Sequence, residues 1–230
     1  MERLGTKYGG WIIPINVKLN EKSIVYSGGV GEDISFDIKL VSKYNCNIYL
    51  IDPTQRAIRH FDEYKYYISN FNYRFKGDIQ KDYYAEIRHE KHNINKMKYL
   101  NIGLYNKKAN LKFYKQKNEK YVSQSLISGM FSDKYDMVEV DSIKNIMKHN
   151  NHTYIDLLKL DIEGAENIVL EQMLDDNIYP KYLCVEFDLL LKKKDHDNTT
   201  NRIIQRLLKN NYKIIINDKY NITFEHISLL

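Results

Sequence analysis

Apolar and polar residues follow two alternating patterns along this chain of 230 residues, and together they predict an α/β fold. Short apolar runs indicate buried strands, and between them apolar residues recur every three or four positions, as on one face of a helix. The main strands are expected from Ser23 to the glycines that follow it and at residues 47–51, 99–105, 154–160, 182–187, 212–216 and 220–227, with an edge strand at 110–114. Helices are expected at residues 33–44, 54–68 and 200–210, near Asp141 and after residue 160.

A glycine-rich turn follows the first expected strand. It spans residues 28–31 and leads into a helix that begins with Glu32 and Asp33. Glycine turns of this kind bind nucleotides, and Asp52, about 20 residues on, stands where an acid can hold ribose hydroxyls. A pyrophosphate needs positive potential at the helix N-terminus, whereas two carboxylates suit the ammonium and sulfonium groups of S-adenosylmethionine. Either acid can instead serve only as a cap of the helix.

Several segments, in order along nearly the whole chain, resemble the FkbM family of S-adenosylmethionine-dependent methyltransferases. The two long segments are YSGGVGEDISFD at residues 26–37 and DLLKLDIEGAE at 156–166, and the short ones are residues 8–11, 51–54, 122–126 and 185–188. The resemblance implies a class I methyltransferase (Rossmann-like) fold, a three-layer sandwich around a mostly parallel seven-stranded sheet with a last antiparallel strand. It also implies O-methylation, often of sugar hydroxyls in glycans, polysaccharides or natural products.

The same resemblance gives a set of residues expected to bind the methyl donor. They are Gly28, Gly29, Gly31, Glu32, Asp33, Asp52, Pro53 and Thr54. The chain departs from the family pattern at Gln124, where relatives tend to carry a histidine between two serines. No catalytic role tied to that histidine is therefore carried over to this chain.

Two of the expected strands end in acids. Asp161 and Glu163 follow the strand at 154–160, and Glu186 and Asp188 close the next one. The family fold makes these strands neighbours, so their carboxylates are expected to share one crevice. A sugar hydroxyl reacts poorly until a base or a metal acts on its proton, so Asp161, Glu163 and Glu186 are candidate catalytic residues. The same acids can alternatively belong to the first turns of helices.

Two further groups are candidates for the chemistry. Ligands that are all oxygen suit Mg²⁺, so Asp161, Glu186 and Asp188 form the candidate metal site. His196 lies in a polar loop after the strand at 182–187, and the pKa range of histidine suits a general base near neutral pH.

Composition agrees with one domain over residues 1–230, because 43% of the residues are hydrophobic and can bury a full core. Residues 1–22 are expected to form an N-terminal arm, and the tyrosine-rich, charged region 70–96 an insertion or variable region. Cys46 and Cys184 are the two cysteines, the N-terminus lacks an apolar signal core, and no membrane span is expected. These features favour a soluble protein of the cytoplasm, or of a host cytoplasm if the source is a virus.

The net charge of +5 invites an interpretation as a nucleic-acid binder. The basic residues are scattered instead of concentrated in a stripe, so the expected partner is a small-molecule or glycan acceptor and not nucleic acid. Two alternatives stay open. One is methylation of nitrogen or of a small molecule that is not a sugar, and the other is a scaffold that binds S-adenosylmethionine without catalysis.

Overall fold

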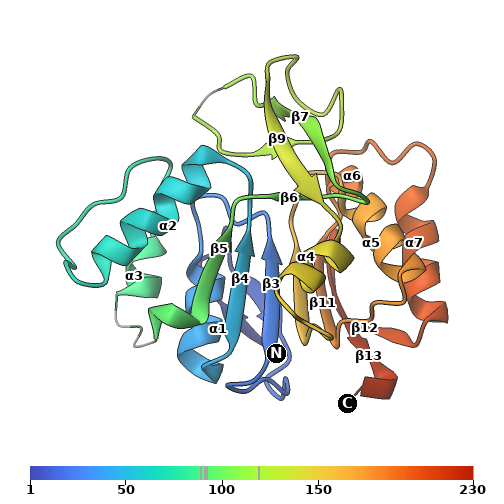
Figure 1. Cartoon of the computed structure of the whole chain (residues 1–230), viewed down its shortest axis with the longest axis horizontal. Helices are drawn as coiled ribbons and strands as arrows, with labels where there is room; N and C mark the ends of the chain where they lie inside the picture. Colours follow the sequence, from blue (N-terminus) through green and yellow to red (C-terminus); the bar gives the residue numbers. More distant parts are fainter. Residues whose placement is uncertain (89, 91–92, 119, 230) are drawn as a thin grey trace.

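The chain is built around one sheet of seven strands (Figure 1). The structure is a computed structural model that describes residues 1–88, 90, 93–118 and 120–229. The strands are β3 (Ile24–Gly28), β4 (Asn47–Ile51), β5 (Met97–Leu100), β10 (Leu157–Leu160), β11 (Tyr182–Glu186), β12 (Tyr212–Asp218) and β13 (Asn221–His226), in the order β12-β13-β11-β10-β3-β4-β5. Neighbouring strands from β5 to β11 pair in parallel, and β13 runs antiparallel to both β11 and β12. The expectation of a mostly parallel seven-stranded sheet is therefore confirmed.

Hydrophobic cores cover both faces of this sheet. Successive residues of a strand point to opposite faces, so Val25 and Leu157 belong to one core while Tyr26 and Leu158 belong to the other. The first core includes side chains of α1 (Ser35–Tyr44), α2 (Gln55–Tyr67) and α3 (Tyr83–Ile87). The second includes side chains of α4 (Ile143–His149), α5 (Glu166–Asp175) and α7 (Thr199–Lys209). Burial on both faces explains why the central strands are nearly continuous apolar runs in the sequence.

Two smaller sheets lie outside the main one. β1 (Glu2–Leu4) pairs with β2 (Trp11–Ile13) in the N-terminal arm, and β6 (Gly103–Leu104), β7 (Ala109–Lys115), β8 (Gln124–Ser125) and β9 (Tyr135–Asp141) form a four-stranded sheet in the order β6-β9-β7-β8. The strand expected at 99–105 was therefore wrong in its extent. It divides after Leu100, because its second half leaves the main sheet and pairs with β9.

The α-helices α2 and α4 each begin with a side-chain cap. Thr54 caps α2, because its Oγ1 accepts a hydrogen bond from the Ala57 N–H at 3.2 Å. The helix expected near Asp141 is α4, and its cap is Ser142, which accepts the N–H of Asn145 at 3.3 Å. A short helix, α6 (Asp188–Leu191), follows β11, and single 3₁₀ turns occupy Ile94–Lys96 and Ile227–Leu229. No helix within the described ranges is long and apolar enough to cross a membrane.

The N-terminal arm and the described part of the region 70–96 both pack against the main fold. Trp11 is buried, and its Nε1 donates a hydrogen bond to Thr223 Oγ1 of β13 at 3.0 Å. Tyr83 of α3 is also buried, and its hydroxyl lies 2.6 Å from Nε2 of His60 on α2. Both segments therefore have fixed places beside the sheet, and both reach the edge at which the parallel strands end.

The turn after β3 passes close to the end of β10. Gly29 has a φ of +74°, and a Cβ placed there would lie 1.7 Å from the backbone oxygen of Asp161. Only glycine combines this left-handed backbone with such a close approach. The turn therefore brings the segment after β3 against the acids that follow β10.

We predict that Gly29→Ala destabilises the fold by about 3 kcal/mol or more, because the added Cβ forces backbone to move in addition to the cost of the left-handed conformation. Gly129→Ala is a matched control, since Gly129 has a φ of +77° and open space around its missing Cβ. It should cost only about 1–2 kcal/mol. Urea denaturation of both variants measures the difference, and equal losses would contradict the close contact.

Candidate active site

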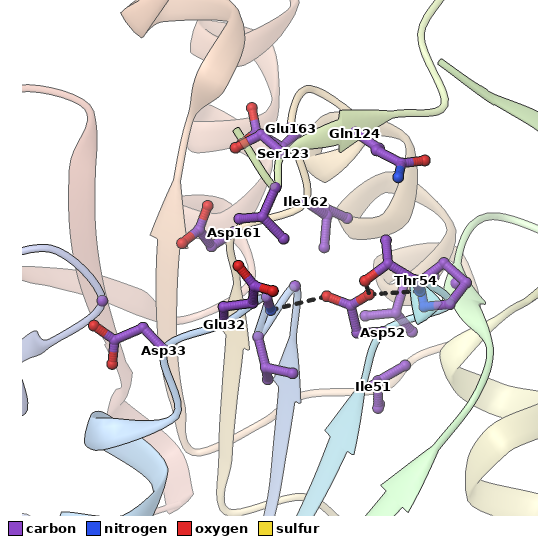
Figure 2. Close-up of a pocket in the computed structure, with 18 of the residues that line it drawn as sticks. Glu32, Asp33, Ile51, Asp52, Thr54, Ser123, Gln124, Asp161, Ile162 and Glu163 are labelled. Atoms are coloured by element: carbon purple, nitrogen blue, oxygen red, sulfur yellow. Dashed lines mark hydrogen bonds between the residues drawn. The ribbon is translucent and has the colours of Figure 1, made fainter. Parts of the chain in front are cut away.

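A cleft opens at the edge where β3, β4 and β10 end (Figure 2). In open α/β sheets this edge is where ligands bind. The cleft is lined by Tyr8, Gly9, Gly29, Val30, Gly31, Glu32, Asp33, Ile51, Asp52, Pro53, Thr54, Gly103, Leu104, Phe113, Val122, Ser123, Gln124, Leu126, Lys159, Asp161, Ile162 and Glu163. It thus brings together most of the residues expected to bind a donor and two of the candidate catalytic acids. Gly28, Glu186, Asp188 and His196 do not belong to its lining.

Asp52 joins the glycine turn to the start of α2. Its Oδ2 accepts the N–H of Gly31 at 3.0 Å, and its Oδ1 accepts both the N–H and the hydroxyl of Thr54, at 2.8 and 2.7 Å (Figure 2). The carboxyl group is buried, and burial raises its pKa even against these donors. Asp52 therefore shapes the turn as well as facing the cleft, and its binding to a ribose stays a prediction.

The two acids at the start of the helix make internal contacts. Glu32 is buried, and its carboxylate pairs with Arg56 and Arg59 and accepts the backbone N–H of Asp78 at 3.0 Å. Burial alone would raise the pKa of Glu32, but the hydrogen bonds from Arg56 and Asp78 outweigh it and hold the pKa below its usual value. Two guanidinium groups therefore compensate the negative charge that we expected to attract the sulfonium.

Asp33 holds the N-terminal arm to the first turn of α1. Its Oδ2 accepts the hydroxyl of Thr6 at 2.5 Å, and its Oδ1 accepts the N–H of Ser35 at 3.0 Å. These contacts correspond to the capping alternative for this acid. No observation here tests its role toward a ligand.

The acids after β10 and β11 form one electrostatic cluster. Burial, and then the charge of Asp188, raises the pKa of Glu163 to about 7 even though Lys192 opposes the shift. Burial, followed by the charges of Asp161 and Asp188, raises the pKa of Glu186 to about 8. The expectation that strands β10 and β11 are neighbours is confirmed by their parallel pairing. Burial, together with the charges of the neighbouring carboxylates, therefore lets Glu163 and Glu186 retain protons near neutral pH.

The loop after β10 is organised by a further acid. Glu166 is buried, and its Oε1 accepts the N–H groups of Ile162 and Gly164, both at 3.0 Å. Burial, together with the charge of Asp188, raises its pKa well above the ordinary value. Glu163 adopts a left-handed backbone in this loop, with a φ of +58°, and its backbone oxygen accepts the hydroxyl of Ser125 at 2.5 Å. Two fixed points therefore hold the Glu163 backbone at the cleft.

Sequence reasoning missed two lysines that compensate the cluster. Lys159 is buried inside β10, with its Nζ 3.4 Å from Oδ2 of Asp161. Burial works against its charge, but Asp161 and Asp37 hold its pKa above the usual value. The signal was present, because a lysine within an apolar run is almost never buried without a partner. Lys192 follows α6 and pairs with both Glu163 and Asp188. Its spacing of four residues from Asp188 was a signal for that pair, whereas nothing in the local pattern indicated the contact with Glu163.

Tyr8 of the N-terminal arm was also missed. It lines the cleft, and 64% of the residue is exposed. Lost hydration of its hydroxyl, and then the charges of Asp161, Glu163 and Glu186, raise the pKa of Tyr8 to about 12. The hydroxyl therefore stays protonated beside the acids, as a hydrogen-bond donor.

The remaining candidates are placed less favourably. Within the described residues there is no group of three or more His, Cys, Asp or Glu side chains that could hold a metal ion, so Asp161, Glu186 and Asp188 do not fit a magnesium site. Lys192 instead occupies one oxygen of Asp188. His196 is exposed in the loop after α6 and does not line the cleft.

Gln124 lies in the cleft above Thr54 and near Ile162 (Figure 2). Its Oε1 is buried and has no hydrogen-bond partner among the described residues. A buried amide oxygen without a partner is costly, so this atom is available to a donor group on a ligand.

Comparison with known proteins gives one family. The model of the methyltransferase FkbM domain matches residues 51–214, which include Asp52 and the acids after β10 and β11 but not the glycine turn. No curated protein matches the chain. Among solved structures, the Methanococcus jannaschii fibrillarin pre-rRNA processing protein is similar, with 11% identity, a TM-score of 0.42, and coverage of 93% of this chain and 68% of that chain.

We predict that raising the pH from about 5 to 8 lowers the stability of the fold through the acid cluster. Glu163 and Glu186 have folded-state pKa values of about 7 and 8, above those of free carboxyl groups. The folded state therefore binds more protons than the unfolded state in this range, and the stability present at low pH is lost as the pH rises. Glu186→Gln removes one such proton site and should flatten the curve of melting temperature against pH.

The control is Glu139→Gln, which removes a carboxylate that is 49% exposed on β9. This variant should keep the pH dependence of the original chain. A Glu186→Gln curve as steep as that of the original chain would contradict the assignment of the raised pKa to this cluster.

Proposed function

The chain belongs to the FkbM methyltransferase family, and from that membership we propose an O-methyltransferase that uses S-adenosylmethionine and acts on a hydroxyl of a sugar or glycan. One observation carries the proposal. A single cleft contains the glycine turn and Asp52 on one side and Asp161 and Glu163 on the other. A donor-binding half and an acid-bearing half therefore face one another, as transfer between two bound molecules requires.

The glycine turn supports the donor half of the proposal. Gly29 and Gly31 have no side chains, so a nucleoside can approach their backbone closely. Asp52 is the acid next to this turn, and Ile51, Leu104 and Ile162 supply apolar walls for a base. The strand order, with β13 antiparallel at the side of β11, agrees with the class I layout that we propose for the fold.

The acids support the catalytic half. When bound, S-adenosylmethionine supplies a methyl group that the acceptor oxygen takes, and S-adenosylhomocysteine leaves. Asp161 accepts the proton of the acceptor hydroxyl as general base, and the buried Lys159, with its Nζ 3.4 Å from Oδ2, holds this carboxylate in place. Tyr8 donates a hydrogen bond next to the reacting atoms and orients the acceptor.

Glu163 and Glu186 modulate this base. Both exchange protons near neutral pH, so they change the charge around Asp161 when the pH changes. No step is assigned to Mg²⁺, because the three acids do not fit a metal site in the described residues. His196 is the next candidate for the base, although it lies outside the cleft.

The alternatives differ in what they require of the cleft. Methylation of a nitrogen or of a small molecule that is not a sugar would use the same donor half with another acceptor. A scaffold without catalysis would need no acids at the junction, whereas Asp161 and Glu163 line the cleft. This arrangement favours an enzyme.

We predict that Asp52→Ala lowers the affinity for S-adenosylhomocysteine by about 2–4 kcal/mol, because hydrogen bonds from two ribose hydroxyls to a charged acceptor are lost. Isothermal titration calorimetry measures the change. Asp62→Ala removes an exposed carboxylate from α2 and should leave the affinity unchanged. Unchanged affinity in Asp52→Ala would remove Asp52 from the donor site, and tighter binding of NAD than of S-adenosylmethionine would overturn the donor assignment.

We predict that Asp161→Asn lowers turnover by a factor of roughly 10² to 10⁴, the range of general base catalysis, with little change in donor affinity. Glu186→Gln should lower turnover less, because it acts through the charge around Asp161. Radiolabelled methyl transfer to a panel of glycan acceptors measures both variants, and Glu171→Gln on α5 is the surface control.

Addition of EDTA separates a base from a metal ligand, because a base survives chelation. Activity lost with EDTA and restored by Mg²⁺ would reinstate the metal. Near-normal turnover in both variants, with a lower melting temperature, would assign these acids to packing instead.

A further inference from the structure

A groove lies next to the cleft and opens into it. The two share Tyr8, Glu32, Asp33, Val122 and Ser123 in their walls. The rest of the groove lining is Asp78 and Gln80 after α2, and Gln116 and Tyr121 after β7. These four residues lie outside the main sheet and outside the glycine turn, whereas Glu32 and Asp33 directly follow that turn.

One ion pair fixes two of these walls. Nη1 of Arg56 donates to the backbone oxygens of Lys120 and Tyr121, at 3.0 and 3.2 Å, while the same guanidinium pairs with Glu32. Glu32 in turn accepts the N–H of Asp78. Gly77 allows this approach, because a Cβ there would lie 2.3 Å from Oε1 of Glu32. The groove is therefore formed before any ligand binds, which lowers the entropy cost of binding.

Two aromatic rings flank the groove. Tyr8 is 64% exposed and Tyr121 is 58% exposed, and no aromatic ring among the described residues packs against either of them. Large exposed rings of this kind offer an apolar face with a polar hydroxyl at its edge. The C–H face of a sugar ring is a matching surface.

Polar side chains supply the other part of the lining. Asp78, Gln80 and Gln116 face the groove, and no hydrogen bond or ion pair ties their side chains to another described residue. A carboxylate only accepts hydrogen bonds, whereas an amide both donates and accepts them. Together they can satisfy several hydroxyl groups, which also both donate and accept.

The charge of the groove restricts the ligand further. Among the described residues, no lysine or arginine lines it, although the whole chain has a net charge of +5. Asp78 is a carboxylate without an ion-pair partner in the described chain, and Asp161 lies at the end of the adjoining cleft. An anionic ligand would meet repulsion here without a cation to compensate it.

We propose that this groove binds an uncharged sugar unit of the acceptor, stacked against Tyr8 and Tyr121 with its hydroxyls on Gln80, Gln116 and Asp78, and that it excludes acceptors with a carboxylate or phosphate. The inference rests on the proposed function. Tyr8 lines both spaces, so it holds the acceptor where the next hydroxyl meets the donor.

Steady-state methyl transfer to neutral oligosaccharides, and to the same oligosaccharides with a uronic acid or a phosphate, tests the groove. Tyr121→Ala and Gln80→Ala should each raise KM for the neutral acceptor about tenfold, the loss of roughly 1.4 kcal/mol, with little change in kcat. The Kd for S-adenosylhomocysteine should stay the same. Tyr154→Ala is the matched control, because this tyrosine is 51% exposed and precedes β10 at the opposite edge of the sheet.

Asp78→Lys tests whether the negative charge of the groove excludes anionic acceptors. It should lower the preference for neutral over anionic acceptors at least tenfold while the donor Kd is kept. Unchanged KM in both Tyr121→Ala and Gln80→Ala, or anionic acceptors preferred by the original chain, would overturn the groove assignment while donor binding and methyl transfer still support the proposed function. Failure of the original chain to bind S-adenosylhomocysteine would overturn both.

Discussion

The ion pair between the buried Glu32 and the half-buried Arg56 is the contact on which the mouth of the cleft depends. Glu32 begins the helix side of the glycine turn, and Arg56 lies in the first turn of α2. Through them, the segments that carry Asp78 and Tyr121 are fastened to the same point. A buried pair contributes little net stability, but loss of one partner leaves an uncompensated charge. The effect of this ion pair is to fix the relative positions of the four segments that carry Glu32, Arg56, Asp78 and Tyr121.

A second set of compensating charges, carboxylates paired with lysines, lies on the opposite side of the cleft. Burial and the neighbouring carboxylates raise the pKa of Glu163 and of Glu186. Lys159 and Lys192 each form an ion pair with an acid of this cluster. Both lysines are held by carboxylates and are not available to an anion. The site is thus acidic toward its ligands although the protein as a whole is basic.

Local patterns predicted the parts of the site that lie at strand ends. An apolar run that predicts a strand ends directly before the glycine turn, before Asp52 and before Asp161. These residues lie together because parallel strands end at one edge of the sheet. The contacts of Glu32 could not be read in this way, because Asp78 lies in a region without clear periodicity. The split after Leu100 was missed for a related reason, since strand propensity does not reveal which sheet a residue joins.

The position of the groove has a consequence for how this protein can change over time. Apart from Glu32 and Asp33, which follow the glycine turn, its lining comes from the arm, the region after α2 and residues after β7, none of which contributes a strand to the main sheet. Substitutions of the side chains of Asp78, Gln80 and Tyr121 leave the packed layers and the glycine turn intact, because none of these side chains belongs to either core. Under the proposed function, acceptor preference can therefore diverge between lineages while the residues proposed to bind the donor stay the same.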